Sequence, residues 1–389
     1  MAELNERLLG DLLRIKAEQQ PDFDVLTFEH LSLDGGKTPD EVRTYRDLAT
    51  NANQIAAALI SQGLDKGGRF GLMMRNHPEY VESMGAASMT GSVFVPIDPR
   101  TQGEKLAYFL QNSECKGLIC ADYCMQAVHE IRADVPTLEW IMVLDTSGEA
   151  GEVDSQYLNN TLSLNQILEA EVAPTVSREV ELQDPLSIMF TSGTTGNPKG
   201  IVIPNERLSG MGMLGFIFGY TETDRPYTGL SLTHGNAMGV TLMPSLGMGL
   251  RGVFSRRFTK SKLLDVCRLH GCTTFSLLGG MATAIYSEPE RPDDGENSLR
   301  LVASAGMPGA IWESFEKRFN LKIFEWYGAM EGGMAFKPVG EGPVGSFGQG
   351  MPGFEMKILD ENDNECAVGE MGEICSRPEA SGSAEVEYY

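Results

Sequence analysis

The sequence predicts an α/β protein with two αβ-layered subdomains, built on mostly parallel sheets, and a small antiparallel β-barrel-like subdomain. Its 389 residues exceed what one hydrophobic core usually organises, and 42% of them are apolar. Short apolar runs alternate with helical patterns along most of the chain, which is typical of parallel strands connected by helices. From Met334 onward, Gly and Pro turns separate short alternating runs, as expected of antiparallel strands.

The first subdomain is expected over residues 1–205. The stretch 44–64 predicts an amphipathic helix, because Thr44 is a suitable N-cap and Gly63 is a suitable end. Strands and helices then alternate in this order: the run RFGLMM, a helix from Pro78 to Thr90, the run SVFVPI and a helix from Gly103 to Asn112.

The second subdomain is expected over residues 206–333 and the third, truncated one over 334–389. The acidic stretch Glu288 to Ser298 is interpreted as a solvated loop. The elements expected in the second subdomain are a helix around Lys260 to His270, the run TTFSLL, a helix after Gly279, the run LRLVASA, a helix from Gly309 to Phe319 and the run LKIFEWYG.

The charge balance argues against two classes of partner. With 31 Lys and Arg against 54 Asp and Glu, the formal net charge is −23, which repels nucleic acid and anionic membrane surfaces. No apolar run reaches the roughly eighteen residues of a membrane span, and the first thirty residues contain no apolar signal core. We therefore expect a cytoplasmic protein without a membrane span and without a nucleic-acid partner.

The seven cysteines predict reduced thiols, because their number is odd and no signal peptide is visible. Cys115, Cys120 and Cys124, with His129 nearby, are the only set to weigh as metal ligands. Their spacing lacks the tight two-residue step of most zinc sites, so we favour buried or surface thiols.

The stretch Thr191 to Gly200, TSGTTGNPKG, carries the strongest chemical signal. It lies between two strand candidates, LSIMF and IVI, so it forms a loop. Gly193 and Gly196 allow backbone N–H groups to converge, hydroxyl side chains add donors, and Lys199 adds charge. Phosphate oxygens are the ligand that uses all of these groups, although the spacing is not that of a Walker loop. By composition alone, a flexible surface turn is an equal alternative.

The order of residues in this loop resembles the phosphate-binding signature of the adenylate-forming superfamily, which contains acyl- and aryl-CoA synthetases, adenylation domains of peptide synthetases and firefly luciferase. Further segments agree with the resemblance, so that it covers nearly the whole chain. They are TYRDL at 44–48, GSVFVPIDP at 91–99, SAGMP at 304–308, YGAME at 327–331, GSFGQGMPG at 345–353 and GEMGEICSR at 369–377.

The resemblance implies roles for the segment 327–331. Glu331 would bind magnesium on ATP, and the ring of Tyr327 would pack against adenine. Met330 replaces the usual Thr, which removes one hydrogen bond to the α-phosphate, worth about 0.5–1.5 kcal/mol. Without the other motifs, Tyr327 would be a core aromatic and Glu331 a surface acid.

The resemblance also implies the full set of site residues and the cofactors ATP, Mg²⁺ and coenzyme A. Thr191, Glu331 and His234 are the expected catalytic residues, and Glu331 and Thr191 the metal ligands. The expected ATP-binding residues are Thr191, Ser192, Gly193, Thr194, Thr195, Gly196, Lys199, Ala305, Gly306, Met307, Tyr327, Gly328 and Met330.

His234 bears on the substrate. It falls where many CoA ligases carry a histidine and where amino-acid-activating domains carry an aspartate, which favours an acid without an α-amino group. A lone histidine can equally be a hydrogen-bonded structural residue, and VPIDP is closer in style to the peptide synthetases. The expected pocket is apolar and rich in Met, which also fills cores. Its residues are His234, Gly235, Met238, Val240, Leu278, Gly279, Gly306, Met330 and Met334, with Met211, Met213 and Met281 as further candidates.

The resemblance therefore implies an ATP-dependent acid–thiol ligase for a small-molecule carboxylic acid, of fatty, alicyclic, aromatic or steroid-like character. An amino-acid-activating domain and an inactive nucleotide-binding relative are the alternatives, and a homodimer is an open assembly state. The family's C-terminal lid of about a hundred residues is absent here. We expect the chain to be the large N-terminal domain, with adenylation weakened about 10²–10³-fold by loss of the lid lysine.

Overall fold

The computed structural model describes residues 4–149, 151–173, 179–191, 198–379 and 388–389. Its residues cluster into two compact units, which are described separately. The first unit is Met1–Thr259 with Tyr388–Tyr389, and the second is Lys260–Glu387. This division falls at a different place from the expected boundaries at 205 and 333, and the three-subdomain scheme remains a prediction.

A mostly parallel sheet forms the centre of the first unit. Only the last pair of strands within the described ranges, β8 and β9, is antiparallel. Gly71 lies in the middle of the sheet, where a Cβ would stand 2.8 Å from Leu118 and 2.9 Å from Leu110. The order is β7 (Leu162–Ser163), β6 (Trp140–Leu144), β5 (Gly117–Ala121), β3 (Arg69–Met73), β4 (Val93–Pro96), β8 (Pro185–Thr191) and β9 (Lys199–Pro204).

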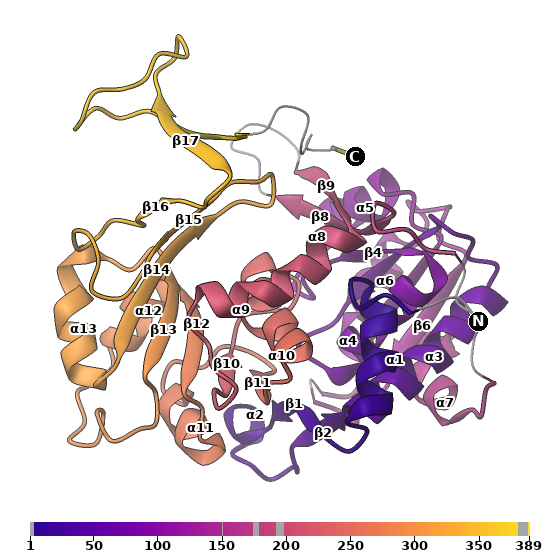
Figure 1. Cartoon of the computed structure of the whole chain (residues 1–389). Helices are drawn as coiled ribbons and strands as arrows, with labels where there is room; N and C mark the ends of the chain where they lie inside the picture. The colour runs from indigo at the N-terminus through magenta and orange to yellow at the C-terminus, as the bar shows by residue number, and fades with distance from the viewer. Residues whose placement is uncertain (1–3, 150, 174–178, 192–197, 380–387) are drawn as a thin grey trace. The chain divides into compact units, whose positions relative to one another are not determined.

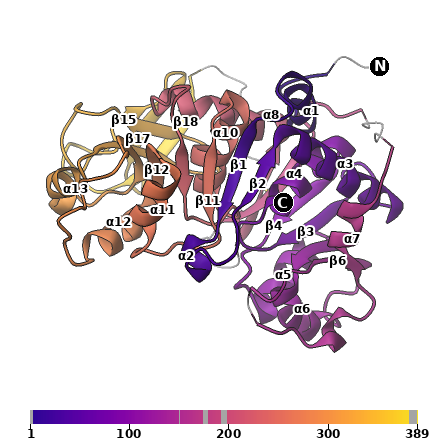
Figure 2. The same ribbon diagram turned by 90° about the horizontal axis from the view of Figure 1, so that it is seen from below.

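Helices cover both faces of this sheet (Figure 2). One face carries α5 (Gly103–Asn112) and α6 (Met125–Ile131), and the other carries α3 (Tyr45–Ser61) and α4 (Pro78–Thr90). Thr44 caps α3 as predicted, because its hydroxyl accepts from the Asp47 N–H at 3.1 Å and the Asp47 carboxylate accepts from the Thr44 N–H at 2.8 Å. Further helical elements of this unit are α1 (Leu9–Gln19), α2 (Leu31–Asp34), α7 (Leu164–Glu169) and the 3₁₀ turns η1 (Asp122–Cys124) and η2 (Ser155–Leu158).

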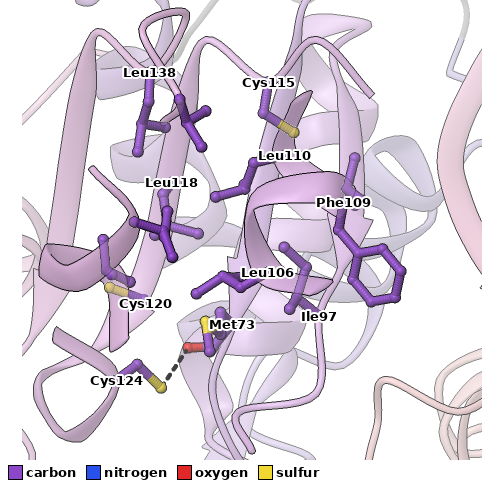
Figure 3. Close-up of a cluster of buried hydrophobic side chains, with 14 of the residues drawn as sticks. Met73, Ile97, Leu106, Phe109, Leu110, Cys115, Leu118, Cys120, Cys124 and Leu138 are labelled. Carbon is purple, nitrogen blue, oxygen red and sulfur yellow. Dashed lines mark hydrogen bonds between the residues drawn. The ribbon is translucent and has the colours of Figure 1, made fainter. Parts of the chain in front are cut away.

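The core between α5, α6 and the sheet is almost wholly apolar (Figure 3). Cys115, Cys120 and Cys124 lie inside it, and the Cys124 thiol donates to the Met73 carbonyl at 3.4 Å. Burial raises the pKa of all three thiols, that of Cys124 to about 12. The His129 ring packs on Tyr157, with 5.0 Å between ring centroids. These cysteines therefore fill the core as small apolar side chains, and all seven in the chain are free thiols.

A second group of strands belongs to the first unit. β10 (Pro226–Thr228), β11 (Gly252–Ser255) and β1 (Asp24–Glu29) run parallel, and β2 (Glu41–Thr44) pairs antiparallel with β1. Arg256 follows β11 and is buried. Its guanidinium bonds Glu149 at 3.0 Å, the Asn76 carbonyl at 2.5 Å and the Glu41 carboxylate. Arg256 thereby links the two groups of strands of this unit.

Two short helical segments follow β9 and β10, in stretches for which no helix was predicted. Gly215 permits them to pack closely, because a Cβ there would stand 2.3 Å from the Met248 sulfur and 3.1 Å from the Pro244 Cβ. The first comprises α8 (Asn205–Gly210), the 3₁₀ turn η3 (Met211–Met213) and α9 (Leu214–Ile217), and the second comprises the π-helix η4 (Ala237–Leu242) and α10 (Met243–Met248).

The second unit repeats the alternation that the sequence predicts. β12 (Thr274–Leu278), β13 (Leu301–Ala305) and β14 (Lys322–Gly328) are parallel, and β15 (Met334–Lys337) and β16 (Gln349–Gly350) continue this group antiparallel. Its helices are α11 (Leu263–His270), α12 (Gly279–Tyr286), the 3₁₀ turn η5 (Gly309–Ile311) and α13 (Trp312–Phe319).

The end of the second unit is antiparallel, as expected. β17 (Phe354–Leu359) and β18 (Glu373–Pro378) form a two-stranded ribbon, drawn in yellow in Figure 1. In the part of the unit that the structure describes, these strands do not close into a barrel. The α/β class with mostly parallel sheets is confirmed, with an open ribbon in place of the expected barrel-like form.

The acidic loop at 288–298 is more ordered than the solvated loop that we expected. Asp294 is buried, and its carboxylate accepts from Arg318 Nε at 2.7 Å and from the Arg291 N–H at 3.0 Å. The pKa of Asp294 is lowered, because these hydrogen bonds and charges outweigh its burial. Sequence alone could not show that arginines from α13 and the loop itself would meet this acid.

Candidate functional site

The glycine-rich stretch of the first unit is the connection of a β-hairpin. Thr191 ends β8 and Lys199 begins β9, and the two residues are paired directly across the ladder. Thr191 is half-buried and Lys199 is exposed. This confirms the expected strands on either side of the loop. Of the predicted phosphate-binding residues, Ser192, Gly193, Thr194, Thr195 and Gly196 lie outside the described residues.

The base of this hairpin is held by an aromatic cluster. The Tyr108 hydroxyl on α5 donates to the Pro198 carbonyl at 3.0 Å. The Phe190 ring stacks on Phe109, with centroids 4.3 Å apart, and meets the Tyr108 ring edge-on at 6.0 Å. These three aromatic residues were not among the predicted site residues. Their only signal was two adjacent aromatics, Tyr108 and Phe109, in an otherwise ordinary amphipathic helix.

Tyr388 and Tyr389 lie beside β9 in the same unit. Tyr388 forms a bridge with Ile201, and the Tyr389 N–H donates to the Gly200 carbonyl at 2.7 Å. Lys199 Nζ lies 5.3 Å from the centre of the Tyr388 ring. The Tyr389 hydroxyl donates to Glu114 at 2.8 Å, and the Arg69 guanidinium lies 4.5 Å from its ring centre. The lysine at the end of the predicted phosphate loop thus has an aromatic neighbour nearly two hundred residues away in sequence.

His234 lies in the turn before the π-helix. Its Nδ1 accepts the Asn236 N–H at 3.2 Å, so the neutral ring carries its proton on Nε2. His234 is exposed as a residue, and partial loss of solvent around its ring lowers its pKa, which favours this neutral form. The predicted pocket residues nearby differ in exposure, since Gly235 is half-buried whereas Met238 and Val240 are completely buried in the π-helix.

In the second unit, the ends of two neighbouring parallel strands approach each other closely. Leu278 ends β12 and is in register with Ala305 at the end of β13. The glycines that follow meet backbone to backbone, because a Cβ on Gly279 would lie 2.2 Å from the Gly306 carbonyl oxygen. Gly306 has φ +94°, a conformation that favours glycine. The structure thus brings Leu278, Gly279, Ala305 and Gly306 together, as the predicted site requires.

Glu325 holds the turn after β13. It is buried on β14, and its carboxylate accepts the Gly306 N–H at 2.5 Å and the Met307 N–H at 3.1 Å. Burial raises the pKa of Glu325 against the effect of these hydrogen bonds. Glu325 was not among the predicted site residues. The available signal was a single acid in the apolar run KIFEWYG.

The predicted Tyr327–Glu331 segment forms the end of β14 and the tip of the β14–β15 hairpin. Gly328 pairs with Met334, and the Gly332 N–H donates to the Ala329 carbonyl at 3.1 Å, which closes the turn. The Tyr327 ring packs near Phe347, with centroids 5.2 Å apart. The remaining predicted residues of this segment, Met330 and Glu331, are half-buried at the tip.

These residues lie at one edge of the sheet of the second unit, because β12, β13 and β14 are adjacent and parallel. Ligands of α/β proteins bind at the carboxyl ends of such strands. None of the predicted site residues lines either of two surface pockets. One of these pockets is lined by residues between Asp98 and Lys105, and the other by residues between Leu299 and Lys322.

The predicted metal ligands suit a magnesium ion that is bound by few protein oxygens. Across the described ranges, no group of three or more His, Cys, Asp or Glu side chains could hold a metal. Magnesium commonly uses only one or two protein oxygens and completes its shell with water and substrate phosphates. The Glu331 carboxylate and the Thr191 hydroxyl are oxygen donors of this type, so each fits the role expected from the sequence.

The fold and these strand-end segments are those of an α/β protein with a candidate ligand site at the carboxyl ends of parallel strands. The sequence matches the family model of AMP-binding enzymes over residues 13–381, and the chain belongs to that family. Within the described part of the chain, every helix is too short or too polar to span a lipid bilayer.

Several curated relatives are named as CoA ligases, and others are named as long-chain fatty acid transport proteins. The chain is 28% identical over 315 residues to a medium/long-chain-fatty-acid–CoA ligase, FadD6, of Mycobacterium tuberculosis, covering 77% of this chain and 48% of the relative. It is 28% identical to FadD17 of Mycobacterium marinum, covering 86% of this chain and 62% of the relative. A crotonobetaine/carnitine–CoA ligase of Salmonella choleraesuis is 26% identical over 89% of this chain and 67% of the relative. The chain thus spans about half to two thirds of their length.

Solved structures share the fold. The anthranilate CoA ligase AuaEII, in complex with anthranoyl-AMP, matches 95% of this chain and 70% of its own with a TM-score of 0.81 and 24% identity. A luciferase-like enzyme from the mealworm Zophobas morio matches 97% of this chain and 87% of its own with a TM-score of 0.81 and 17% identity. The family match and the CoA-ligase relatives, together with this shared fold, confirm the membership of the adenylate-forming superfamily that was expected from the loop motif.

Proposed function

We propose that this chain is the nucleotide- and acid-binding portion of an ATP-dependent carboxylic acid–CoA ligase. The observation that carries the proposal is the shared edge of β12, β13 and β14. There the turn at 304–308, held by Glu325, lies near the Tyr327–Glu331 segment on neighbouring strands. Family membership and the names of the relatives support this assignment.

Each unit would supply part of the chemistry. In the first unit, Lys199 and the loop that begins at Thr191 would bind the β- and γ-phosphates. In the second, the 305–307 turn and Tyr327 would bind adenosine. Glu331 of the second unit and Thr191 of the first would each be a magnesium ligand. Magnesium would neutralise phosphate charge. The acid carboxylate would then attack the α-phosphorus and release pyrophosphate, and the CoA thiol would take the acyl group and release AMP, with catalysis by positioning and charge.

The acid would be apolar, with fatty acids the foremost class. Two of the relatives named above act on medium- and long-chain fatty acids. The neutral His234 offers an N–H donor and no charge for a substrate ammonium group, which argues against an amino-acid-activating domain. An inactive nucleotide-binding relative is the second alternative, suggested by Met330 in place of the family's usual threonine.

The first test measures Mg-ATP binding to the 389-residue chain by calorimetry. We expect Glu331→Ala to weaken Mg-ATP binding at least about tenfold, the cost of losing one charged oxygen ligand. The same substitution should leave metal-free ATP binding within about twofold. Glu341→Ala, at an exposed acid beyond β15, is the matched control.

The second test is turnover. The chain extended through the family's C-terminal lid should release AMP from ATP only when an apolar acid and CoA are both present. AMP release with amino acids in preference to fatty acids would support the adenylation-domain alternative. Mg-ATP binding that is indifferent to Glu331→Ala, without AMP release, would support the inactive relative. The cytoplasmic location and the homodimer remain predictions.

A further inference from the structure

We propose that Glu325 is a positioning residue for nucleoside binding. It acts by holding the Gly306–Met307 turn, and Lys337 and Trp312 support the Glu325 side chain. The inference rests on the proposed function, because it assigns that turn to the AMP portion of the substrate. All of the residues involved lie in the second unit.

The carboxylate of Glu325 is occupied by backbone donors. One oxygen accepts the Gly306 N–H at 2.5 Å and the Met307 N–H at 3.1 Å, and the other accepts the Met307 N–H at 3.2 Å. The side chain is 4% exposed. The hydrogen bonds to the turn therefore fix the conformation of the Glu325 side chain. Because this side chain is buried, Glu325 acts on a ligand through the turn and not by direct contact.

The turn that Glu325 holds needs an external support. Gly306 is exposed and has φ +94°. Glycine can adopt many other backbone conformations, so this one has to be selected by neighbouring groups. Its carbonyl side is limited by Gly279, whose Cα–H faces it so closely that a side chain there would collide. Its N–H side is fixed by Glu325. The two neighbours together select one conformation of an otherwise mobile residue.

The negative charge of Glu325 is balanced by a buried lysine. Lys337 on β15 is in register with Glu325 on β14 and is also 4% exposed. Its Nζ lies 4.5 Å from the centre of the Trp312 ring, a cation–π contact made by α13. Burial raises the pKa of Glu325, whereas the positive charge of Lys337 lowers it and so favours the charged form. Burying two opposite charges contributes little net stability compared with apolar residues of similar size. Their use here is better explained by the fixed geometry of the 306–307 turn.

Two separate ligands test the inference. The turn would contact the nucleoside of AMP, whereas inorganic pyrophosphate is assigned to Lys199 of the first unit. A defect in Glu325 should therefore weaken AMP binding and leave inorganic pyrophosphate binding unchanged. A general loss of folding would weaken both.

The experiment measures the dissociation constants of AMP and of magnesium pyrophosphate with the 389-residue chain by calorimetry. Glu325→Gln keeps the size of the side chain but supplies a single acceptor oxygen. We expect Glu325→Gln to raise the dissociation constant of AMP about tenfold, because the backbone N–H groups lose a charged hydrogen-bond acceptor. The pyrophosphate constant should stay within about twofold. Glu313→Gln, at an exposed acid on α13, is the control and should change neither constant.

A second variant covers the case in which Glu325→Gln fails to fold. Glu325→Asp keeps the charge and shortens the side chain by one methylene, so it should also weaken AMP binding selectively. Equal AMP affinity in the wild type and a folded Glu325 variant would overturn the inference, as would equal weakening of both ligands. If the wild-type chain binds neither AMP nor pyrophosphate, the proposed function fails, and the inference fails with it.

Discussion

Gly279 and Gly306 meet backbone to backbone at the ends of two adjacent parallel strands. A Cβ placed on Gly279 would lie 2.2 Å from the Gly306 carbonyl oxygen, a distance that real Cβ atoms do not tolerate. The contact explains why this position carries glycine even though it begins helix α12, where other residues form helix more readily. The close approach decides the residue type.

Gly279→Ala should therefore displace the Gly306 turn. We expect a loss of about 1–3 kcal/mol in the free energy of unfolding, measured with urea, because the new methyl group meets backbone and not a flexible side chain. Gly280→Ala is the matched control, since nothing lies within 4 Å of its Cβ and alanine favours helix. Equal effects of the two substitutions would contradict this account of the contact.

Lys199 provides a second prediction, on ligand binding. Lys199→Ala should raise the dissociation constant of magnesium pyrophosphate by about tenfold or more, because it removes the cation at the end of the β8–β9 loop. Calorimetry on the 389-residue chain measures this constant. Lys116→Ala, which removes an exposed lysine before β5, should leave it unchanged. A similar loss for both lysines would mean that net charge alone attracts the anion.

Glu82 provides a prediction of pH dependence. Glu82 is completely buried on α4 beside Glu79, and one of its oxygens bonds Arg43 at 2.9 Å and Asn51 at 2.7 Å. Burial and the neighbouring acid raise the pKa of Glu82 to about 7. The folded state thus holds a proton that the unfolded chain releases. This contribution to stability is present at low pH and is lost as pH rises toward and through about 7.

Glu82→Gln should remove this loss. We expect the variant to be more stable than the wild type at pH 8 by about 1–3 kcal/mol and nearly equal to it at pH 5, as judged from urea unfolding at both values. Glu139→Gln, at an exposed acid before β6, should leave the wild-type pH profile intact. A Glu82→Gln profile parallel to the wild type would refute the role given to this carboxyl.

Arg256 provides the last prediction. Its side chain is 1% exposed, and removing it would leave Glu149 and Glu41 without their cation. Arg256→Met should cost about 3–5 kcal/mol in the free energy of unfolding, the usual effect of breaking a buried ion pair. Arg257→Met, at the exposed neighbouring residue, should change stability by less than about 0.5 kcal/mol. Urea denaturation measures the free energy of unfolding of both variants, and equal losses would contradict the role given to Arg256.

Local sequence signals were sufficient for the regular elements. The predicted helices at 78–90 and 103–112 agree with α4 and α5, and Thr44 caps α3, because capping, helical periodicity and glycine ends act within a few residues. The same local logic failed for α8 to α10. Their glycines lower helix propensity, and only the close packing of Gly215 on Met248 and Pro244 shows why one of these glycines is there.

The candidate site was predictable to a similar extent. The order of residues in 191–200, 304–308 and 327–331 identified the family and the strands that carry its motifs. Glu325, Lys337, Tyr108 and Tyr388 were not predictable, because each acts on a residue far away in sequence. Contacts between residues that are distant in sequence produce no fixed spacing along the chain, so no motif indicates them.

The sequence by itself determined the α/β class, the family and the short motifs, since these depend on periodicity and on residues adjacent along the chain. The tertiary structure alone decided which distant groups complete them. It placed Glu325 under the Gly306 turn and Tyr388 beside Lys199, and it packed the cysteines at 115–124 into the core. Strand register and burial set these contacts, and both are properties of the folded chain as a whole.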